Sequence, residues 1–195
     1  MSSSLKLVIG LGNPGSRYSG TRHNAGFWFV DRVAEKYSCS FSRAQKFTGN
    51  VARLRSNEID CLLLKPLTSM NESGRSVRAM MAYYNITPAR ILVVHDEIDF
   101  DPGTIRIKKG GGAAGHNGVR DIIDCIGSNA FLRIRIGVGH PGHRDRVIGS
   151  VLGKPTRAER KLILEAIDRG IDVFPVILAG DYQKAMNRLH TTEQE

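Results

Sequence analysis

Hydrophobic and polar positions alternate along this chain in a pattern that predicts strands and helices in turn. Short apolar runs at Leu5–Ile9 and Ile91–Val94 are typical of buried strands. Apolar residues at helical spacing predict helices over about residues 24–37, from about 73 to before Pro88, over 117–126, after Pro155 and from Asp181. Strands that alternate with helices in this way indicate an α/β fold.

Four further segments have the alternating pattern of strands. Residues 48–54 and 59–64 are separated by the turn candidates Asn57 and Glu58, which predicts an antiparallel hairpin. Residues 104–108 and 132–136 place apolar and basic side chains on opposite faces. We therefore expect one α/β domain over residues 1–195, built on a mixed, twisted β-sheet flanked by helices.

The composition indicates in which cellular compartment the protein is expected. The 195-residue chain has no apolar stretch near the roughly 18–20 residues that span a bilayer, and its N-terminus lacks a signal-peptide layout. Its three cysteines, Cys39, Cys61 and Cys125, are far apart and form no CxxC pair. We expect reduced thiols, no structural zinc and a cytoplasmic protein without membrane contact.

The charge balance indicates an anionic partner. Lys and Arg number 28 against 19 Asp and Glu, for a net charge of +9. Basic residues are concentrated in residues 1–56 and again between Arg106 and Arg135. A basic surface can exist only for solubility, but such clusters also suit contact with a nucleic-acid backbone.

The segment LGNPGSRYSGTRHNAGF, residues 11–27, allows two interpretations. With Gly10 it fits the dinucleotide-binding pattern GxGxxG, which requires a helix directly after the glycines and an acidic residue about 20 positions on. Here Pro14 and a polar run delay the helix to about Asn24, and the nearest acids fall inside that helix. This context argues against a binding site for NAD(P). A glycine-rich bend that presents polar side chains, or one without chemistry, remains open.

Four polar islands lie at predicted strand ends or helix starts. They are Asn13 with His23, residues 65–71, residues 95–99, and the glycine-rich residues 110–118. Because ligands in open α/β sheets bind beyond the carboxyl ends of strands, we expect the islands to meet in one cleft.

These islands offer a histidine base, an acid to orient it, and three amides. A neutral imidazole can take a proton from water, and Asn side chains can donate to a developing oxyanion. No Ser or Cys stands in a nucleophile elbow, so ester hydrolysis by activated water fits. Helix capping is the ordinary role of Asn at positions such as Asn71 and Asn117, and His140 with His143 suits a solvated turn better than a metal.

At these residues the sequence closely resembles the bacterial-type peptidyl-tRNA hydrolases. The motifs that carry the resemblance are LVIGLGNPG, TRHNAGFWFVD, KPLTSMNESGRSV, VVHDEIDFDPGTIRIKKGGG, GHNGVRDII, RIRIGVGHPG and VLGKP. The resemblance implies cofactor-independent cleavage of the ester between a peptide and the 3′-terminal ribose of tRNA. The partner it implies is the acceptor stem and 3′-end of peptidyl-tRNA, and we expect a monomer.

The resemblance implies three sets of site residues and no metal. In the catalytic set, His23 is the base, Asp96 supports it and Asn13 positions the substrate. The substrate-binding residues are Tyr18, Met70, Asn71 and Asn117. The residues that contact tRNA phosphate are Arg106, Lys108 and Arg135.

One position departs from the family pattern. Ala114, in Ala113-Ala114, stands where many members have glycine, so we expect a stiffer or differently shaped loop. Some relatives keep this fold as non-catalytic RNA-binding proteins. The presence of His23, Asp96 and the three asparagines argues against that alternative.

Overall fold

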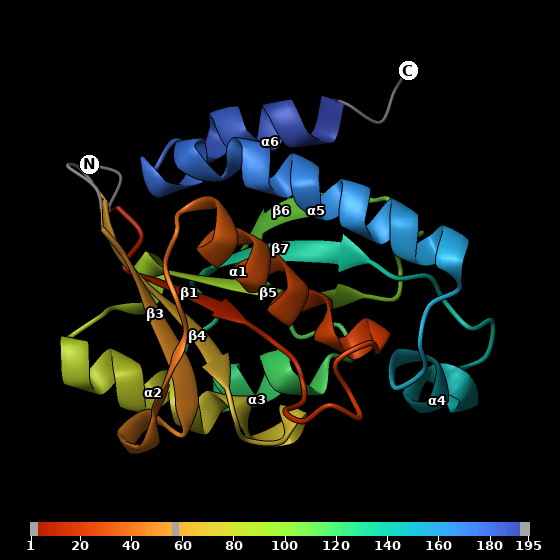
Figure 1. Cartoon of the computed structure of the whole chain (residues 1–195), viewed down its shortest axis with the longest axis horizontal. Coiled ribbons are helices and arrows are strands. Elements are labelled where there is room, and N and C mark those ends of the chain that lie inside the picture. The colour runs from red at the N-terminus through yellow and green to blue at the C-terminus, as the bar shows by residue number, and fades with distance from the viewer. Residues whose placement is uncertain (1–3, 56–58, 192–195) are drawn as a thin grey trace.

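A seven-stranded mixed sheet lies between two layers of helices in the computed structural model, which describes residues 4–55 and 59–191 (Figure 1). The strand order is β2-β3-β4-β1-β5-β7-β6. The strands are β1 (Leu7–Gly10), β2 (Ser42–Ala44), β3 (Gly49–Arg55), β4 (Asp60–Pro66), β5 (Ile91–Glu97), β6 (Ile105–Lys109) and β7 (Leu132–Gly137). The helices are α1 (Ala25–Lys36), α2 (Ser73–Tyr84), α3 (Asn117–Ile126), α4 (Val147–Val151), α5 (Arg157–Leu178) and α6 (Tyr182–Thr191).

Strand pairing confirms the predicted mixed sheet. Strand β1 runs parallel to β4 on one side and to β5 on the other, and β7 runs parallel to β5. The pairs β2–β3, β3–β4 and β6–β7 are antiparallel. The predicted hairpin of β3 and β4 is therefore present, whereas its predicted turn at Asn57 and Glu58 lies outside the described residues.

Both faces of the sheet are buried, each against its own helices. Helices α1, α5 and α6 cover one face, and α2 and α3 cover the other (Figure 1). Within β1, Val8 packs in the core beneath α1, α5 and α6, while Leu7 and Ile9 pack in the core against α2 and α3. Because side chains alternate across a strand, a strand buried on both faces is apolar throughout, which explains the continuous run of β1.

Several details differ from the prediction. The three-residue strand β2 and the five-residue helix α4 are too short to show periodicity. Strand β5 continues past Val94 to Glu97, because the polar side chains at its end are buried with partners instead of forming a loop. On α2, Val77 and Met80 are fully buried as predicted, but Tyr84 is 39% exposed.

The parallel strands β1, β4 and β5 end at one edge of the sheet, which brings the first three predicted islands together there. The fourth island follows the antiparallel strand β6 and begins at the opposite edge, but its later part reaches the site through His116, which contacts Asp96. Strands β1 and β7 point to the same side of the molecule, and α4 lies beyond that edge (Figure 1). None of the helices in the described part of the chain has the length and apolar character that a membrane span needs.

Candidate active site

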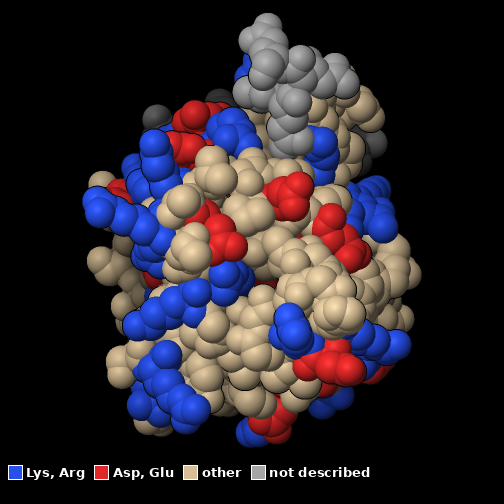
Figure 2. All heavy atoms as spheres, turned by 90° about the vertical axis from the view of Figure 1, so that its right-hand side faces the viewer, with Lys and Arg blue, Asp and Glu red and all other residues tan. Residues whose placement is uncertain are grey.

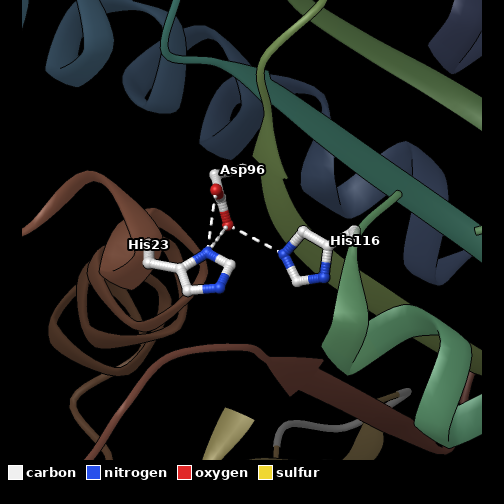
Figure 3. A group of neighbouring side chains, drawn as sticks. All are labelled: His23, Asp96 and His116. Atoms are coloured by element: carbon white, nitrogen blue, oxygen red, sulfur yellow. Dashed lines mark hydrogen bonds and ion pairs between the residues drawn. The ribbon is translucent and has the colours of Figure 1, made fainter. Parts of the chain in front are cut away.

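The centre of the site is a hydrogen bond between His23 and Asp96, which are 73 positions apart. Asp96 is the penultimate residue of β5 and is only 2% exposed. His23 lies in the 3₁₀ turn η1 (Arg22–Asn24) that leads into α1. Its Nδ1 atom is 2.9 Å from both carboxylate oxygens of Asp96 (Figure 3). The structure thus joins the first and third predicted islands.

Burial and neighbouring charges together determine the protonation of Asp96 and the tautomer of His23. Burial opposes ionisation of Asp96, but the neighbouring His23 and His116 outweigh it and hold the pKa of the carboxyl well below its ordinary range. Burial would also lower the pKa of His23, yet the charge of Asp96 and its hydrogen bond raise it above the usual imidazole value. An ionised Asp96 only accepts, so Nδ1–H of His23 donates. The opposite nitrogen, Nε2, points away from the carboxylate and is the basic atom (Figure 3).

His116 also contacts Asp96, and it was not among the predicted site residues, although it lies in the glycine-rich island. Its Nε2 atom is 2.9 Å from Oδ1 of Asp96. Its Nδ1 atom caps α3 by accepting the N–H of Val119 at 3.3 Å, which leaves Nε2–H to donate to Asp96. The available signal was a histidine immediately before a predicted helix start, a position that favours a hydrogen-bond acceptor.

His95 completes the packing beside these rings. It is fully buried, and its Nδ1–H donates to the backbone oxygen of Asp96 at 2.7 Å. Its ring lies edge-on to that of His116, with centroids 4.8 Å apart. Burial, followed by repulsion from His116, lowers the pKa of His95 to about 3, so this ring is neutral.

Asn13 is held at both its side chain and its backbone. Its Oδ1 accepts the N–H of Met70 at 2.9 Å. Asn24, at the start of α1, grips the Asn13 backbone, accepting its N–H at 2.8 Å and donating to its carbonyl at 3.0 Å. With Oδ1 engaged, the part of the Asn13 amide that a ligand can use is the Nδ2 donor.

Close packing, rather than a phosphate cradle, explains the glycines at the end of β1. A Cβ on Gly10 would lie 2.4 Å from the carbonyl oxygen of Gly26, and one on Gly26 would lie 2.3 Å from that of Val94. Helix α1 can therefore approach β1 and β5 closely enough to bring His23 to Asp96. Of the three glycines of the GxGxxG match, only Gly15 has a positive φ, at 97°. The expected bend thus depends on glycine flexibility only at Gly15.

A cleft of about 340 Å³ opens above these groups. It is lined by all seven residues predicted for catalysis and substrate binding: Asn13, Tyr18, His23, Met70, Asn71, Asp96 and Asn117. Its opposite wall is apolar and comes from α4 and the residue after it: Val147, Ile148, Val151 and Leu152. This wall, in which Ile148 is 70% exposed, was not predicted from the sequence.

Ala114 also lines the cleft, and its backbone is unusual. It has a φ of 48°, in the left-handed region that favours glycine. The departure from the family pattern therefore falls at a position where the loop adopts a conformation that alanine tolerates poorly.

The three predicted phosphate contacts lie outside the residues that line the cleft. In the β6–β7 register Arg106 faces Arg135 and Lys108 faces Arg133, so all four lie on one face of the sheet. Lys108 is exposed. Arg135 is engaged: its Nε and Nη2 atoms are each 2.9 Å from Oε2 of Glu97, and its guanidinium stacks 4.5 Å from the centre of the Phe100 ring.

Arg133, which was not predicted as a site residue, is buried and donates to the carbonyls of Gly111 and Gly112. It therefore anchors the glycine-rich loop. The surface at the carboxyl edge of the sheet shows a central hollow with Lys and Arg side chains gathered on its flanks and some Asp and Glu between them (Figure 2).

His23, Asp96 and His116 are also of the residue types that bind metals, and their ligand atoms lie within 4.8 Å of one another. The two N–O distances from the histidines to Asp96 are 2.9 Å, which is the length of a hydrogen bond. His140 accepts the N–H of Gly142 at 3.0 Å, as expected for a turn.

A histidine paired with a buried carboxylate at the floor of a cleft is suited to general acid–base chemistry, and the comparisons with known proteins identify the class as a hydrolase. The family model described as peptidyl-tRNA hydrolase matches residues 7–195. The peptidyl-tRNA hydrolase of Pectobacterium atrosepticum is 52% identical over 189 residues, 96% of this chain and 97% of its own. That of Coxiella burnetii is 49% identical over 191 residues, 98% of this chain and 100% of its own.

A solved structure of the peptidyl-tRNA hydrolase from Acinetobacter baumannii superimposes with a TM-score of 0.93. It is 48% identical, and the match covers 97% of this chain and 96% of the other. The chain belongs to the peptidyl-tRNA hydrolase family. The family resemblance and the mixed α/β fold expected from the sequence are thereby confirmed.

Proposed function

We propose that this chain hydrolyses the ester between a peptide, or an N-blocked amino acid, and the 3′-terminal ribose of tRNA, with His23 as general base. Membership of the family supports the reaction class. The observation that carries the residue assignment is the 2.9 Å contact of His23 Nδ1 with both oxygens of Asp96, because it leaves the basic Nε2 atom to serve the cleft.

The chemistry follows from these protonation states. Nε2 of His23 takes a proton from water as its oxygen attacks the ester carbonyl, and Asp96 stabilises the imidazolium that forms. Nδ2 of Asn13 donates to the oxyanion of the tetrahedral intermediate. As the intermediate collapses, the bond between the carbonyl carbon and the ribose oxygen breaks. The imidazolium returns the proton to that oxygen, which gives free tRNA and a peptide carboxylic acid.

The cleft divides the substrate between two kinds of surface. The amides of Asn71 and Asn117 are exposed at its rim and suit the ester and the peptide backbone, while Tyr18 and Met70 line the path of the peptide. Arg106, Lys108 and Arg135 bind tRNA phosphates from the adjacent sheet face, with the exposed Lys108 as the most accessible cation of the three. Every group in this scheme comes from one chain, so we propose that it acts as a monomer and as a single domain.

The direct test is incubation with N-acetyl-aminoacyl-tRNA, with and without EDTA. We expect tRNA to be released at the same rate in both, because a water, a histidine and a carboxylate supply the whole reaction. Binding of tRNA without cleavage would instead identify an RNA-binding protein of the same fold. Loss of cleavage in EDTA would overturn the proposed mechanism.

A further inference from the structure

Arg22, the residue before the proposed base, ties the two walls of the cleft together. Its Nη1 atom donates to the carbonyls of Lys154 at 3.0 Å and Ser150 at 3.3 Å. Its Nη2 atom is 2.8 Å from Oε2 of Glu159 in α5, and its backbone N–H donates to the carbonyl of Gly153 at 3.1 Å. One side chain thus reaches a segment 128–137 positions away in sequence.

The ion pair between Arg22 and Glu159 is partly buried, and Glu159 belongs to a capped helix start. The Arg22 side chain is 13% exposed, so the pair with Glu159 is shielded more than an ordinary surface ion pair. The same Oε2 atom of Glu159 accepts the N–H of Thr156 at 2.6 Å in the capping box that starts α5. The anchor for Arg22 is therefore the fixed first turn of a 22-residue helix.

The segment that Arg22 holds is the apolar wall of the cleft. Helix α4 has five residues, fewer than a helix needs to be stable alone, so contacts from elsewhere must set its position. Val151 packs inward at 7% exposure, whereas Ile148 and Leu152 are 70% and 40% exposed. Both exposed side chains line the cleft, as does His23. Exposed apolar groups beside a binding site are suited to a ligand that covers them.

We propose that Arg22 is a positioning residue that fixes the α4 wall relative to His23, so that the peptide part of the substrate is held between them. This inference rests on the proposed function and identifies the surface that binds the peptide. A peptide of several apolar residues uses the wall, whereas a single N-acetylated residue reaches little of it. The contribution of Arg22 therefore grows with peptide length.

The test compares Arg22→Met and Arg22→Lys on N-acetyl-aminoacyl-tRNA and on a peptidyl-tRNA with several apolar residues. For Arg22→Met we expect KM to rise about tenfold on the long substrate and by less than about threefold on the short one, a loss of binding rather than of chemistry. Lysine has a single ammonium group in place of the several N–H donors of the guanidinium, so Arg22→Lys should recover only part of the KM difference between Arg22→Met and the wild-type protein. The matched control is Arg53→Met, which breaks the Arg53–Asp60 pair on the β3–β4 hairpin and should change neither KM.

Hydrogen exchange of residues 147–154 supplies a readout that does not depend on catalysis. We expect faster exchange there in Arg22→Met. The same is expected in Glu159→Gln, which weakens the anchor from its other side and replaces Arg22→Met as the test if that variant does not fold. An equal KM change on both substrates, or a loss of thermal stability with unchanged KM values, would overturn the proposal. If the wild-type protein cleaved neither substrate, the proposed function would fall, while unchanged exchange in the variants would separately reject the tether.

Discussion

The Nε2 atom of His116 lies 2.9 Å from Oδ1 of Asp96. The same oxygen accepts Nδ1–H of His23, so the proposed base shares its carboxylate with a second imidazole. Because the second donor keeps Asp96 ionised and fixes its rotation, it also fixes the orientation of the base.

Removal of that donor should slow the chemical step. We expect His116→Ala to lower kcat by about tenfold, equivalent to about 1.4 kcal/mol in the barrier. His116→Gln, which can still donate to Asp96, should retain more activity than the alanine variant. Single-turnover rates at saturating enzyme measure this step, and a wild-type rate for His116→Ala would show that the contact does not support catalysis.

The pH–rate profile should report the pKa of His23. The base must be neutral, so activity should fall as the pH drops through a midpoint that lies above the ordinary imidazole value, since Asp96 raises this pKa. In Asp96→Asn the charge is gone and burial remains, so the midpoint should move to lower pH while the maximal rate falls. An unchanged midpoint in Asp96→Asn would contradict this electrostatic role. The measurement is the single-turnover rate across the pH range in both proteins.

His95 should make the fold sensitive to acid. Its pKa is about 3 in the folded protein and higher in the unfolded chain, so below about pH 6.5 the unfolded chain binds a proton that the folded protein does not. Stability should therefore fall as the pH drops, by up to about 1.4 kcal/mol per pH unit from this group.

His23 and Asp96, which lie beside His95, do not account for a fall in the free energy of unfolding between pH 6 and 4.5. His23, whose pKa is raised by folding, contributes stability that is complete below the unfolded pKa and is lost only as the pH rises through the folded pKa. Asp96, whose pKa is lowered, loses its contribution as the pH falls through its depressed value. Urea unfolding of His95→Phe should show a shallower slope than the wild-type protein, and an equal slope would reject the assignment.

Lys108 and Arg135 should behave differently when removed. Lys108→Ala should weaken tRNA binding and reduce the salt dependence of log K by about 0.7–0.9 for each phosphate that is no longer neutralised, with little effect on stability. Arg135→Ala should also destabilise the fold by about 3–5 kcal/mol, because it leaves the buried Glu97 without its partner. Binding titrations over a salt series and urea unfolding measure both effects. A Lys108→Ala protein with unchanged salt dependence would remove Lys108 from the phosphate site.

Local pattern was sufficient to predict the helices other than α4, the hairpin of β3 and β4, and the sheet edge at which the first three islands lie. Local pattern placed His23 and Asp96 among the polar islands but left a structural role open for each. Their catalytic assignment came from the family resemblance, and the structure adds that the two side chains are in contact. The pairing of Arg135 with Glu97 could not be predicted, because it depends on the register of strands far apart in sequence. Helix α4 and the contacts of Arg22 were missed for the same reason: they are defined by tertiary contacts and not by periodicity.

The measurement that tests the role of His23 most directly is the single-turnover rate of His23→Asn on N-acetyl-aminoacyl-tRNA, alongside its Kd for tRNA. We predict a rate at least about 100-fold below that of the wild-type protein, as expected for loss of a general base, with the Kd unchanged. A variant that binds tRNA normally and cleaves the ester at a near wild-type rate would contradict the assignment of His23 as the base.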